Sequence, residues 1–340
     1  MKAFLLLGIV VACAGCATGP TMMTAGAARN DIEAACRALP GEQPVIKGIS
    51  VRDEPSATGD LAAMRVTSEA TGAFMRIYYD TGSERIARAR AACLGAQLPM
   101  IERETRDTRR GAEWSSAVFT QNTAYIPPRG EGVKQRWQVD VQPDGNLSPL
   151  GRVMVVHTIP HEQVHAYQTR AGARPPRWVA EGHASWIQSR IARLLNPAIA
   201  RTQHQLRMDD AAKGEGPLNL AQWGSRRPKR EALLRQVSPE DRARMEADLT
   251  FNPTGMFTFT PEDFEGDTTN TSGQYLAAEA VFSGLESRHG AEKVRTWMSE
   301  LTASSNRITP PSLAESVKRN FGEDVSDLLV EPVSSASDKE

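Results

Sequence analysis

The chain has 340 residues, of which 40% are hydrophobic and 24% are charged. This composition is ordinary for a globular protein, and the length suffices for one large catalytic domain with an accessory lobe. The formal net charge of −1 favours neither nucleic acid nor an anionic membrane surface as a partner.

The N-terminal residues have the pattern of an export signal. Lys2 is followed by an apolar run over 4–11 that is too short to span a bilayer as a helix. Small residues then lead into Cys16, and this segment resembles the lipobox of bacterial lipoproteins, with Cys13 as a second candidate. The resemblance implies that 1–16 is a lipoprotein signal peptide and that the lipidated cysteine ties the chain to a membrane. A plain signal peptide is the alternative. No aspartate follows either cysteine, which indicates the outer membrane of the cell envelope, on the side facing the periplasm.

The segment that follows is rich in small residues and contains one of the remaining cysteines. Residues 17–45 are predicted to be a tether, with a short helix over 31–39. If Cys16 is lipidated, Cys36 and Cys93 are the two cysteines left in the mature chain. An oxidising periplasm would allow a disulfide between them, and two separate thiols are an equal alternative.

Residues 46–150 are predicted to form a small lobe of mixed α and β structure. Alternating apolar and polar residues predict a strand over 74–79, and the Ala/Arg-rich stretch after it predicts a helix over 83–100. Two apolar triplets around a polar pair predict a hairpin over 117–126, which could pair with an extended substrate. A further strand is expected over 136–141.

Residues 151–331 are predicted to form a mainly helical lobe. Within it, 196–270 is polar and broken by Pro and Gly, so we interpret it as an insertion. The tail over 332–340 is rich in Ser and Asp and is expected to be disordered. The sequence predicts helices over about 160–171, 177–195, 230–248, 274–289, 291–303 and 311–321.

The most informative motif is the HExxH pattern from His161 to His165. On a helix, residues four positions apart share a face, so the two histidines can present their ring nitrogens to one zinc ion. Glu162 projects from the neighbouring edge of the same turn, where it can take a proton from water at the metal. Pro160 suits the first turn of such a helix. The alternative is a helix with two surface histidines that bind nothing.

A catalytic zinc ion needs a third protein ligand and one open position. After His165 the chain turns at 171–172 and 175–176, and a second predicted helix begins. Glu181 lies on the second turn of that helix, so a short antiparallel return brings its carboxylate opposite the first helix. His161, His165 and Glu181 then form the His₂Glu set of known catalytic zinc sites.

These two segments resemble the gluzincin metallopeptidases, and most closely the bacterial peptidase-MA-like group. There an HExxH helix is followed by a Trp-x-x-Glu-Gly-x-Ala segment, which Trp178, Glu181, Gly182 and Ala184 match position by position. The resemblance implies a zincin-like α+β fold, with a small mixed N-terminal lobe that contains a β-sheet and a mainly helical C-terminal lobe. It also implies one Zn²⁺ ion and a peptide or protein substrate.

Three further residues are candidates for a role at the site, one by the resemblance and two by their positions near the motif. A later stretch from Tyr275 to Gly290 also matches a family helix, and the match implies that Tyr275 donates a hydrogen bond to the tetrahedral oxyanion. A packing tyrosine is the alternative. For His183 three roles stay open: a spare ligand, a residue that holds a ligand in place, or a buried histidine. His157 is expected to be structural or to support a ligand.

The sequence therefore predicts a zinc metallopeptidase that hydrolyses peptide bonds with Glu162 as general base and Tyr275 as a second catalytic group. The alternative is an envelope lipoprotein that binds zinc without turnover and serves as an interaction or structural module. The substrate and the oligomeric state stay open at this stage.

Overall fold

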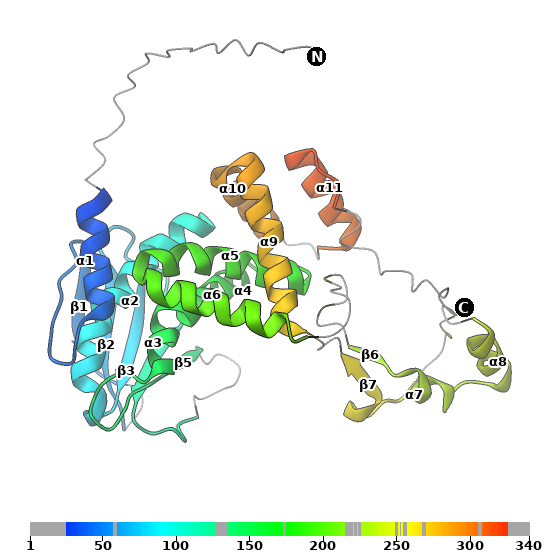
Figure 1. The fold of residues 1–340 in the computed structure, drawn as a ribbon, viewed down its shortest axis with the longest axis horizontal. Helices are drawn as coiled ribbons and strands as arrows, with labels where there is room; N and C mark the ends of the chain where they lie inside the picture. Colours follow the sequence, from blue (N-terminus) through cyan, green and yellow to red (C-terminus); the bar gives the residue numbers. More distant parts are fainter. Residues whose placement is uncertain are drawn as a thin grey trace, which may run out of the picture.

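A computed structural model of the chain describes residues 25–56, 60–126, 135–172, 175–214, 220, 223, 226–248, 251, 253, 257–266, 270–304 and 308–325. The first part of the chain forms a five-stranded sheet, and a mainly helical part follows it (Figure 1). The predicted α+β class is therefore confirmed. The predicted signal peptide over 1–16 and the disordered tail over 332–340 lie outside the described residues, so both stay predictions.

The sheet combines an antiparallel meander with two parallel strands. Its order is β1-β2-β3-β4-β5, in which β1, β2 and β3 are antiparallel and β4 and β5 run parallel to β3. Successive side chains of a strand face opposite sides, so Met64 and Ile77 pack in the main core, while Tyr78 and Val118 form a small cluster on the other face. The bounds are β1 (Ile49–Glu54), β2 (Ala62–Ser68), β3 (Phe74–Tyr79), β4 (Ser116–Thr120) and β5 (Arg136–Asp140).

Helix α2 (Glu84–Thr105) makes the crossover between the parallel strands β3 and β4 and packs on the sheet. It runs beyond the predicted end at residue 100. A glycine lets it approach closely, because a Cβ added at Gly95 would lie 2.4 Å from Ile49 Cγ2 and 2.5 Å from Val66 Cγ1. The main core therefore begins directly under the sheet.

The predicted hairpin over 117–126 is wrong. Its first half is β4, which lies between β3 and β5 and is parallel to both, and its second half is not a strand. The Asp80 carboxylate accepts hydrogen bonds from Thr120 Oγ1 (2.8 Å) and from the Gln121 backbone N–H (2.9 Å), which turns the chain away at the end of β4. Because β4 already has two neighbours, a substrate strand could pair with this sheet only at β1 or β5.

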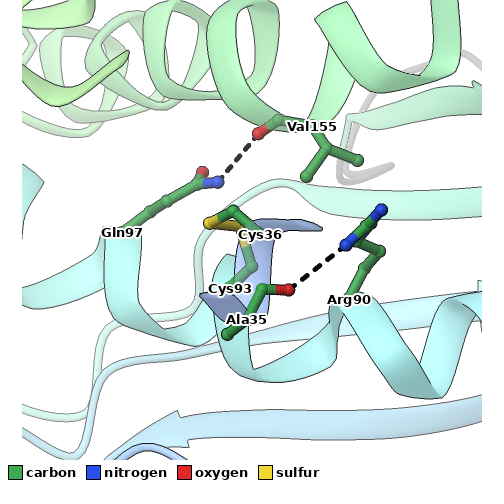
Figure 2. Close-up of a disulfide and its surroundings, with 6 residues drawn as sticks. All are labelled: Ala35, Cys36, Arg90, Cys93, Gln97 and Val155. Atoms are coloured by element: carbon green, nitrogen blue, oxygen red, sulfur yellow. Dashed lines mark hydrogen bonds between the residues drawn. A yellow bond between two sulfur atoms is a disulfide. The ribbon is translucent and has the colours of Figure 1, made fainter. Parts of the chain in front are cut away.

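Part of the predicted tether is a helix that packs on the folded body. Helix α1 (Ala25–Arg37) is longer than the helix expected over 31–39, and Ala35 and Cys36 are buried in the main core. The structure settles the question about the cysteines, because Cys36 and Cys93 form a disulfide that joins α1 to α2 (Figure 2). A cross-link over this separation typically contributes about 2–4 kcal/mol to the free energy of unfolding.

The second part of the chain is mainly helical, and the helices predicted over 177–195 and 291–303 have the observed bounds. The helix predicted over 230–248 is divided in two, because the Ser238 side chain and Pro239 start a new helix there. The helices are α3 (Pro149–Val153), η2 (Met154–Thr158), α4 (Ile159–Arg170), α5 (Arg177–Leu195), α6 (Pro197–Ala211), α7 (Arg230–Leu234), α8 (Pro239–Ala247), α9 (Thr271–His289), α10 (Ala291–Ala303) and α11 (Pro310–Phe321).

Helix α6 lies in the segment that we interpreted as an insertion, and the sequence predicted no helix there. Asn196 caps its first turn, since its side chain accepts the Ile199 N–H (3.2 Å), and the helix packs against α5 and α9. The short strands β6 (Arg226–Pro228) and β7 (Phe264–Gly266) lie with α7 and α8 on the side away from the five-stranded sheet (Figure 1). None of the helices that the structure describes is long and apolar enough to cross a membrane.

A buried ion network joins three helices. The Glu104 carboxylate on α2 is 1% exposed and lies 3.0 Å from Arg190 Nε on α5 and 3.0 Å from Arg295 Nε on α10. Burial opposes the charge, but the hydrogen bond from Arg295 and the charge of Arg190 lower the pKa of Glu104 below its usual range. The ionised network therefore fixes the position of α5, which contains Glu181.

Candidate metal centre

The predicted metal-binding helix is the end of a longer helical run. Helices α3, η2 and α4 follow one another directly, and η2 is a π-helical turn in which the Ile159 N–H bonds to the Met154 carbonyl. Pro160 has no N–H, and in a regular α-helix its ring would clash with the carbonyl of Val156. The wider π turn directly before Pro160 relieves this conflict, so the HExxH motif begins on continuous helix.

Two buried glutamines, Gln97 and Gln163, hold the continuous helical segment formed by α3, η2 and α4 in place. The Gln163 amide accepts the Ser115 N–H (2.9 Å) and donates to the Ser115 carbonyl (2.8 Å), which joins α4 to the start of β4. Gln97 Nε2 on α2 donates to the Val155 carbonyl in η2 (2.8 Å). Both side chains are 1% exposed, so these bonds are shielded from water and hold α4 against the sheet.

The three predicted metal ligands come together. His161 Nε2 lies 3.0 Å from His165 Nε2 and 3.1 Å from Glu181 Oε2, and the last distance, from His165 Nε2 to Glu181 Oε2, is 3.2 Å. Among the described residues these are the three side chains that could hold a metal ion together. The exposed fractions of their side chains rise from 10% for His161 through 15% for Glu181 to 27% for His165, so the group is reached from the His165 side.

The geometry of the group fits a tetrahedral ion. Ligand atoms at about 2.0–2.1 Å from such an ion are separated from one another by about 3.3 Å. The observed separations of 3.0–3.2 Å lie close to this value. Two imidazole nitrogens and a carboxylate oxygen are also the donor types that zinc prefers. The residues therefore fit one zinc ion with a position left for a further ligand.

Hydrogen bonds at Nδ1 of the His161 and His165 rings leave their Nε2 atoms free to bind a metal ion. Gln168 Nε2 donates to the Ala180 carbonyl (3.1 Å), so its Oε1 must face His165 and accepts from Nδ1 (2.8 Å). In the same way, Gln188 Oε1 lies 3.2 Å from His161 Nδ1. With a proton on each Nδ1, both Nε2 atoms present lone pairs toward Glu181.

Neither glutamine was predicted from the sequence, although their spacing gives a signal. Gln168 lies one helical turn after His165, and Gln188 lies two turns after Glu181, so each shares a face with a predicted ligand. Polar residues at these spacings are candidates for holding the ligands in place.

We expect that replacing Gln168 with Leu weakens zinc binding by about 10–100-fold, because the His165 ring loses the acceptor that orients it. Competition with a chromophoric zinc chelator measures the change in affinity. The matched control is Gln205→Leu, since Gln205 is exposed on α6. Equal affinities of the two variants would show that Gln168 does not orient His165.

The two remaining histidines of this region, His157 and His183, are not part of the group formed by the predicted ligands. His183 is fully buried between Trp186 and Phe282, and its Nδ1 lies 3.4 Å from Gln168 Nε2. His157 lies against Gln188, which contacts His161. Both support the glutamines that orient the ligands, and burial lowers the pKa of each to about 3, so both rings are neutral.

The electrostatics of the group favour a positive charge at its centre. Burial opposes ionisation of Glu181, but the two adjacent histidines, His161 and His165, lower its pKa, so the carboxylate stays charged. Burial also opposes a charge on His165, yet Glu181 raises the pKa of this ring. Beside them, burial raises the pKa of the half-buried Glu162 to about 7, against the effect of His165.

Tyr275 lies at the edge of this group. Its ring on α9 is 6.1 Å from the His161 ring and 4.7 Å from the Trp223 ring. Burial and the neighbouring Glu181 carboxylate raise the pKa of Tyr275, so the hydroxyl keeps its proton. Arg177 Nε also lies close by, 3.8 Å from Glu181 Oε1. From its ring contacts and the effect of Glu181, Tyr275 packs on Trp223 and also has its hydroxyl near the predicted ligands.

A glycine brings α5 and α9 into close contact beside the predicted ligand Glu181. A Cβ added at Gly182 would lie 2.8 Å from the Ala278 carbonyl oxygen and 2.9 Å from Phe282 Cε2. Since the first of these is a backbone atom, α9 would have to move to make room. Tyr275 lies on the same helix, so its position relative to the ligands depends on this contact.

Comparison with known proteins gives a distant likeness. No family model and no curated protein matches the chain. Among solved structures it is similar to a mutant of the M1 zinc metallopeptidase from Deinococcus radiodurans, with a TM-score of 0.33 and 14% sequence identity over 83% of this chain and 51% of that one. The chain thus spans about half the length of that protein. An assignment of function rests on the side chains of the metal centre.

Proposed function

We propose that this chain is a zinc-dependent peptidase in which His161, His165 and Glu181 bind one Zn²⁺ ion. The observation that carries the proposal is the convergence of two imidazole nitrogens and one carboxylate oxygen at separations of 3.0–3.2 Å. This is the ligand set of known catalytic zinc sites. A zinc ion there supplies a Lewis acid that polarises a carbonyl group and lowers the pKa of water.

Glu162 is the general base of the proposed reaction. It follows His161 directly on α4, is half-buried and is not part of the ligand group, and it lies close enough to His165 and Glu181 for both to affect its pKa. Burial raises its pKa above that of a free carboxyl group, which favours its acceptance of a proton. Glu162 takes a proton from the attacking water and passes it to the leaving amine.

Tyr275 is the proposed donor to the oxyanion that forms when water attacks the peptide carbonyl. Its hydroxyl is protonated and lies on α9 beside Glu181, on the side of the centre formed by α5 and α9. A donor that is already oriented toward the developing charge lowers the barrier without reorganisation. The half-buried ring, packed edge-on against Trp223, limits the positions that the hydroxyl can take.

Removal and return of the metal test the proposal. We expect the purified protein to cleave peptides from a fluorogenic library, to lose this activity after dialysis against a zinc chelator, and to regain it with one equivalent of Zn²⁺. His161→Ala should show no recovery. Peptide hydrolysis that is equal before and after removal of the metal would contradict the proposal.

An envelope protein that binds zinc without turnover is the other candidate. A purely structural zinc site is closed by four protein ligands, whereas the described residues provide three. A structural site also has no need of the half-buried carboxylate of Glu162. Both observations favour turnover, and the library experiment separates the two candidates because only a peptidase releases products.

We further propose that the chain is held in the cell envelope by a lipid on Cys16, with Cys13 as the fallback. The export signal in the sequence and the Cys36–Cys93 disulfide, which suits an oxidising compartment, support this location. Cys16→Ser is expected to move the protein from the membrane fraction to the soluble fraction, as cell fractionation and immunoblotting would show. Membrane association that survives replacement of both Cys13 and Cys16 would rule out the lipid anchor.

A further inference from the structure

A cavity lies beside η2 and is separate from the predicted metal ligands. Its volume is about 350 Å³, and it is lined by residues of α1, α2, α3, η2, the start of α6 and the loop after β5. Apolar side chains form much of its wall, among them Ile86, Leu147 and Val155. None of the predicted metal ligands lines it.

A buried arginine without an acidic partner forms one side of this cavity. Arg90 on α2 is 5% exposed, and its Nη1 donates to the Ala35 carbonyl of α1 (3.3 Å) (Figure 2). Its Nε is buried and has no hydrogen-bond partner. Among the described residues, no carboxylate lies within salt-bridge distance of Arg90, and none of those that line the cavity is acidic. Burial of such a charge is unfavourable without a counter-ion.

A second guanidinium faces the same cavity. Arg152 on α3 donates to the Leu147 carbonyl (2.8 Å) and lines the cavity with Arg90. Burial and the like charge of Arg152 together lower the pKa of Arg90 to about 10, while Glu42 acts in the opposite direction without restoring it. Glu42 is already engaged, because its carboxylate accepts the Leu39 N–H (2.7 Å). An anion between the two guanidinium groups would remove the repulsion and satisfy the unpaired Nε.

The apolar residues that line the rest of the cavity indicate which kind of anion would fit. The apolar residues around the guanidinium groups suit a short hydrocarbon chain, and a volume near the lower end of ligand pockets suits a small molecule. We propose that this cavity binds a small organic carboxylate, whose carboxylate group lies between Arg90 and Arg152 and whose apolar part packs on Ile86, Leu147 and Val155. The disulfide supports this site, because Cys36 lines the cavity and its bond to Cys93 holds α1 in place beside Arg90.

The test uses hexanoate as the carboxylate, hexanamide as its uncharged analogue and inorganic phosphate as an anion without a chain. Isothermal titration calorimetry of the purified, zinc-loaded protein should show saturable binding of hexanoate at millimolar concentration and no binding of hexanamide. Arg152→Gln should weaken hexanoate binding by about tenfold or more, and Arg90→Gln should abolish it. Arg152 is exposed, so its replacement keeps the test valid if Arg90→Gln does not fold.

Two controls exclude other binding sites for hexanoate. Glu181→Ala should bind it as the wild type does, because the cavity does not involve the metal centre, and Arg319→Gln, which changes an exposed arginine on α11, should also leave binding unchanged. Equal binding of hexanoate and hexanamide, tighter binding of phosphate than of hexanoate, or an affinity for hexanoate unaffected by Arg152→Gln would each overturn the proposal. The proposal would also be overturned if no hexanoate binding were detected at concentrations up to about ten millimolar, where even weak binding of a small ligand would be seen.

Discussion

Replacing Glu162 with Gln is expected to lower kcat for peptide hydrolysis by about 10²–10⁴-fold, the usual contribution of a positioned general base. Gln has nearly the same shape as Glu but cannot accept the proton from water. The three ligand atoms belong to other residues, so zinc content should be unchanged. Steady-state kinetics on a cleaved library peptide, combined with metal analysis of the same sample, measure both quantities.

The outcome separates a catalytic from a structural role of this carboxylate. A loss of activity that accompanies a loss of zinc would mean that Glu162 stabilises the site rather than acting as the base. A kcat within about threefold of the wild type would exclude it as the base, since general bases contribute much more. Glu300→Gln provides the control, because Glu300 is exposed on α10.

Replacing Glu181 with Ala is expected to weaken zinc binding by about 10²–10⁴-fold, because one of three ligands contributes roughly a third of the binding free energy typical of protein zinc sites. The two histidines remain, but they carry no formal negative charge to offset the charge of the ion. Competition with a chromophoric chelator measures the affinity. In thermal unfolding, the variant should lose much of the stabilisation that zinc gives to the wild type.

The same measurement decides whether Glu181 belongs to the ligand set. Unchanged zinc stoichiometry and affinity would remove it from the set and with it the His₂Glu assignment. Arg177→Ala is an informative companion, because Arg177 lies 3.8 Å from the other carboxylate oxygen of Glu181 without being a possible ligand. The zinc affinity of Arg177→Ala should stay within about tenfold of the wild type. Loss of a contact that orients a ligand typically weakens metal binding by about tenfold or more.

The convergence of His161, His165 and Glu181 could be predicted because it depends on helical spacing and on one short return of the chain. His161 and His165 are four positions apart on one helix, and the return of the chain to α5 puts Glu181 opposite them. The observed bounds of α5 equal the predicted ones, since Pro176 precedes the helix and Asn196 ends it. Local signals of this kind need no knowledge of the rest of the fold.

The parts that could not be predicted depend on contacts between distant residues. The strand at 116–120 has the apolar pattern of either a hairpin strand or a central parallel strand, and only its pairing with β3 and β5 decides between them. Helix α1 has a composition typical of a tether, but the disulfide and the sheet-covering helix α2 fix it in the core. Gln168 and Gln188 have roles that depend on the tertiary partners of their amides.

The contact at Gly182 means that a residue without a side chain sets the distance between α5 and α9 beside the proposed zinc site. Helix α9 can come no closer to α5 than the Ala278 carbonyl allows, and it can come that close only while position 182 carries a hydrogen atom. One additional methyl group would push α9 away from α5 and move Tyr275, whereas His161 and His165 lie on α4 and do not take part in this contact. In the proposed peptidase, catalytic rate is therefore expected to respond to this position more strongly than metal content does.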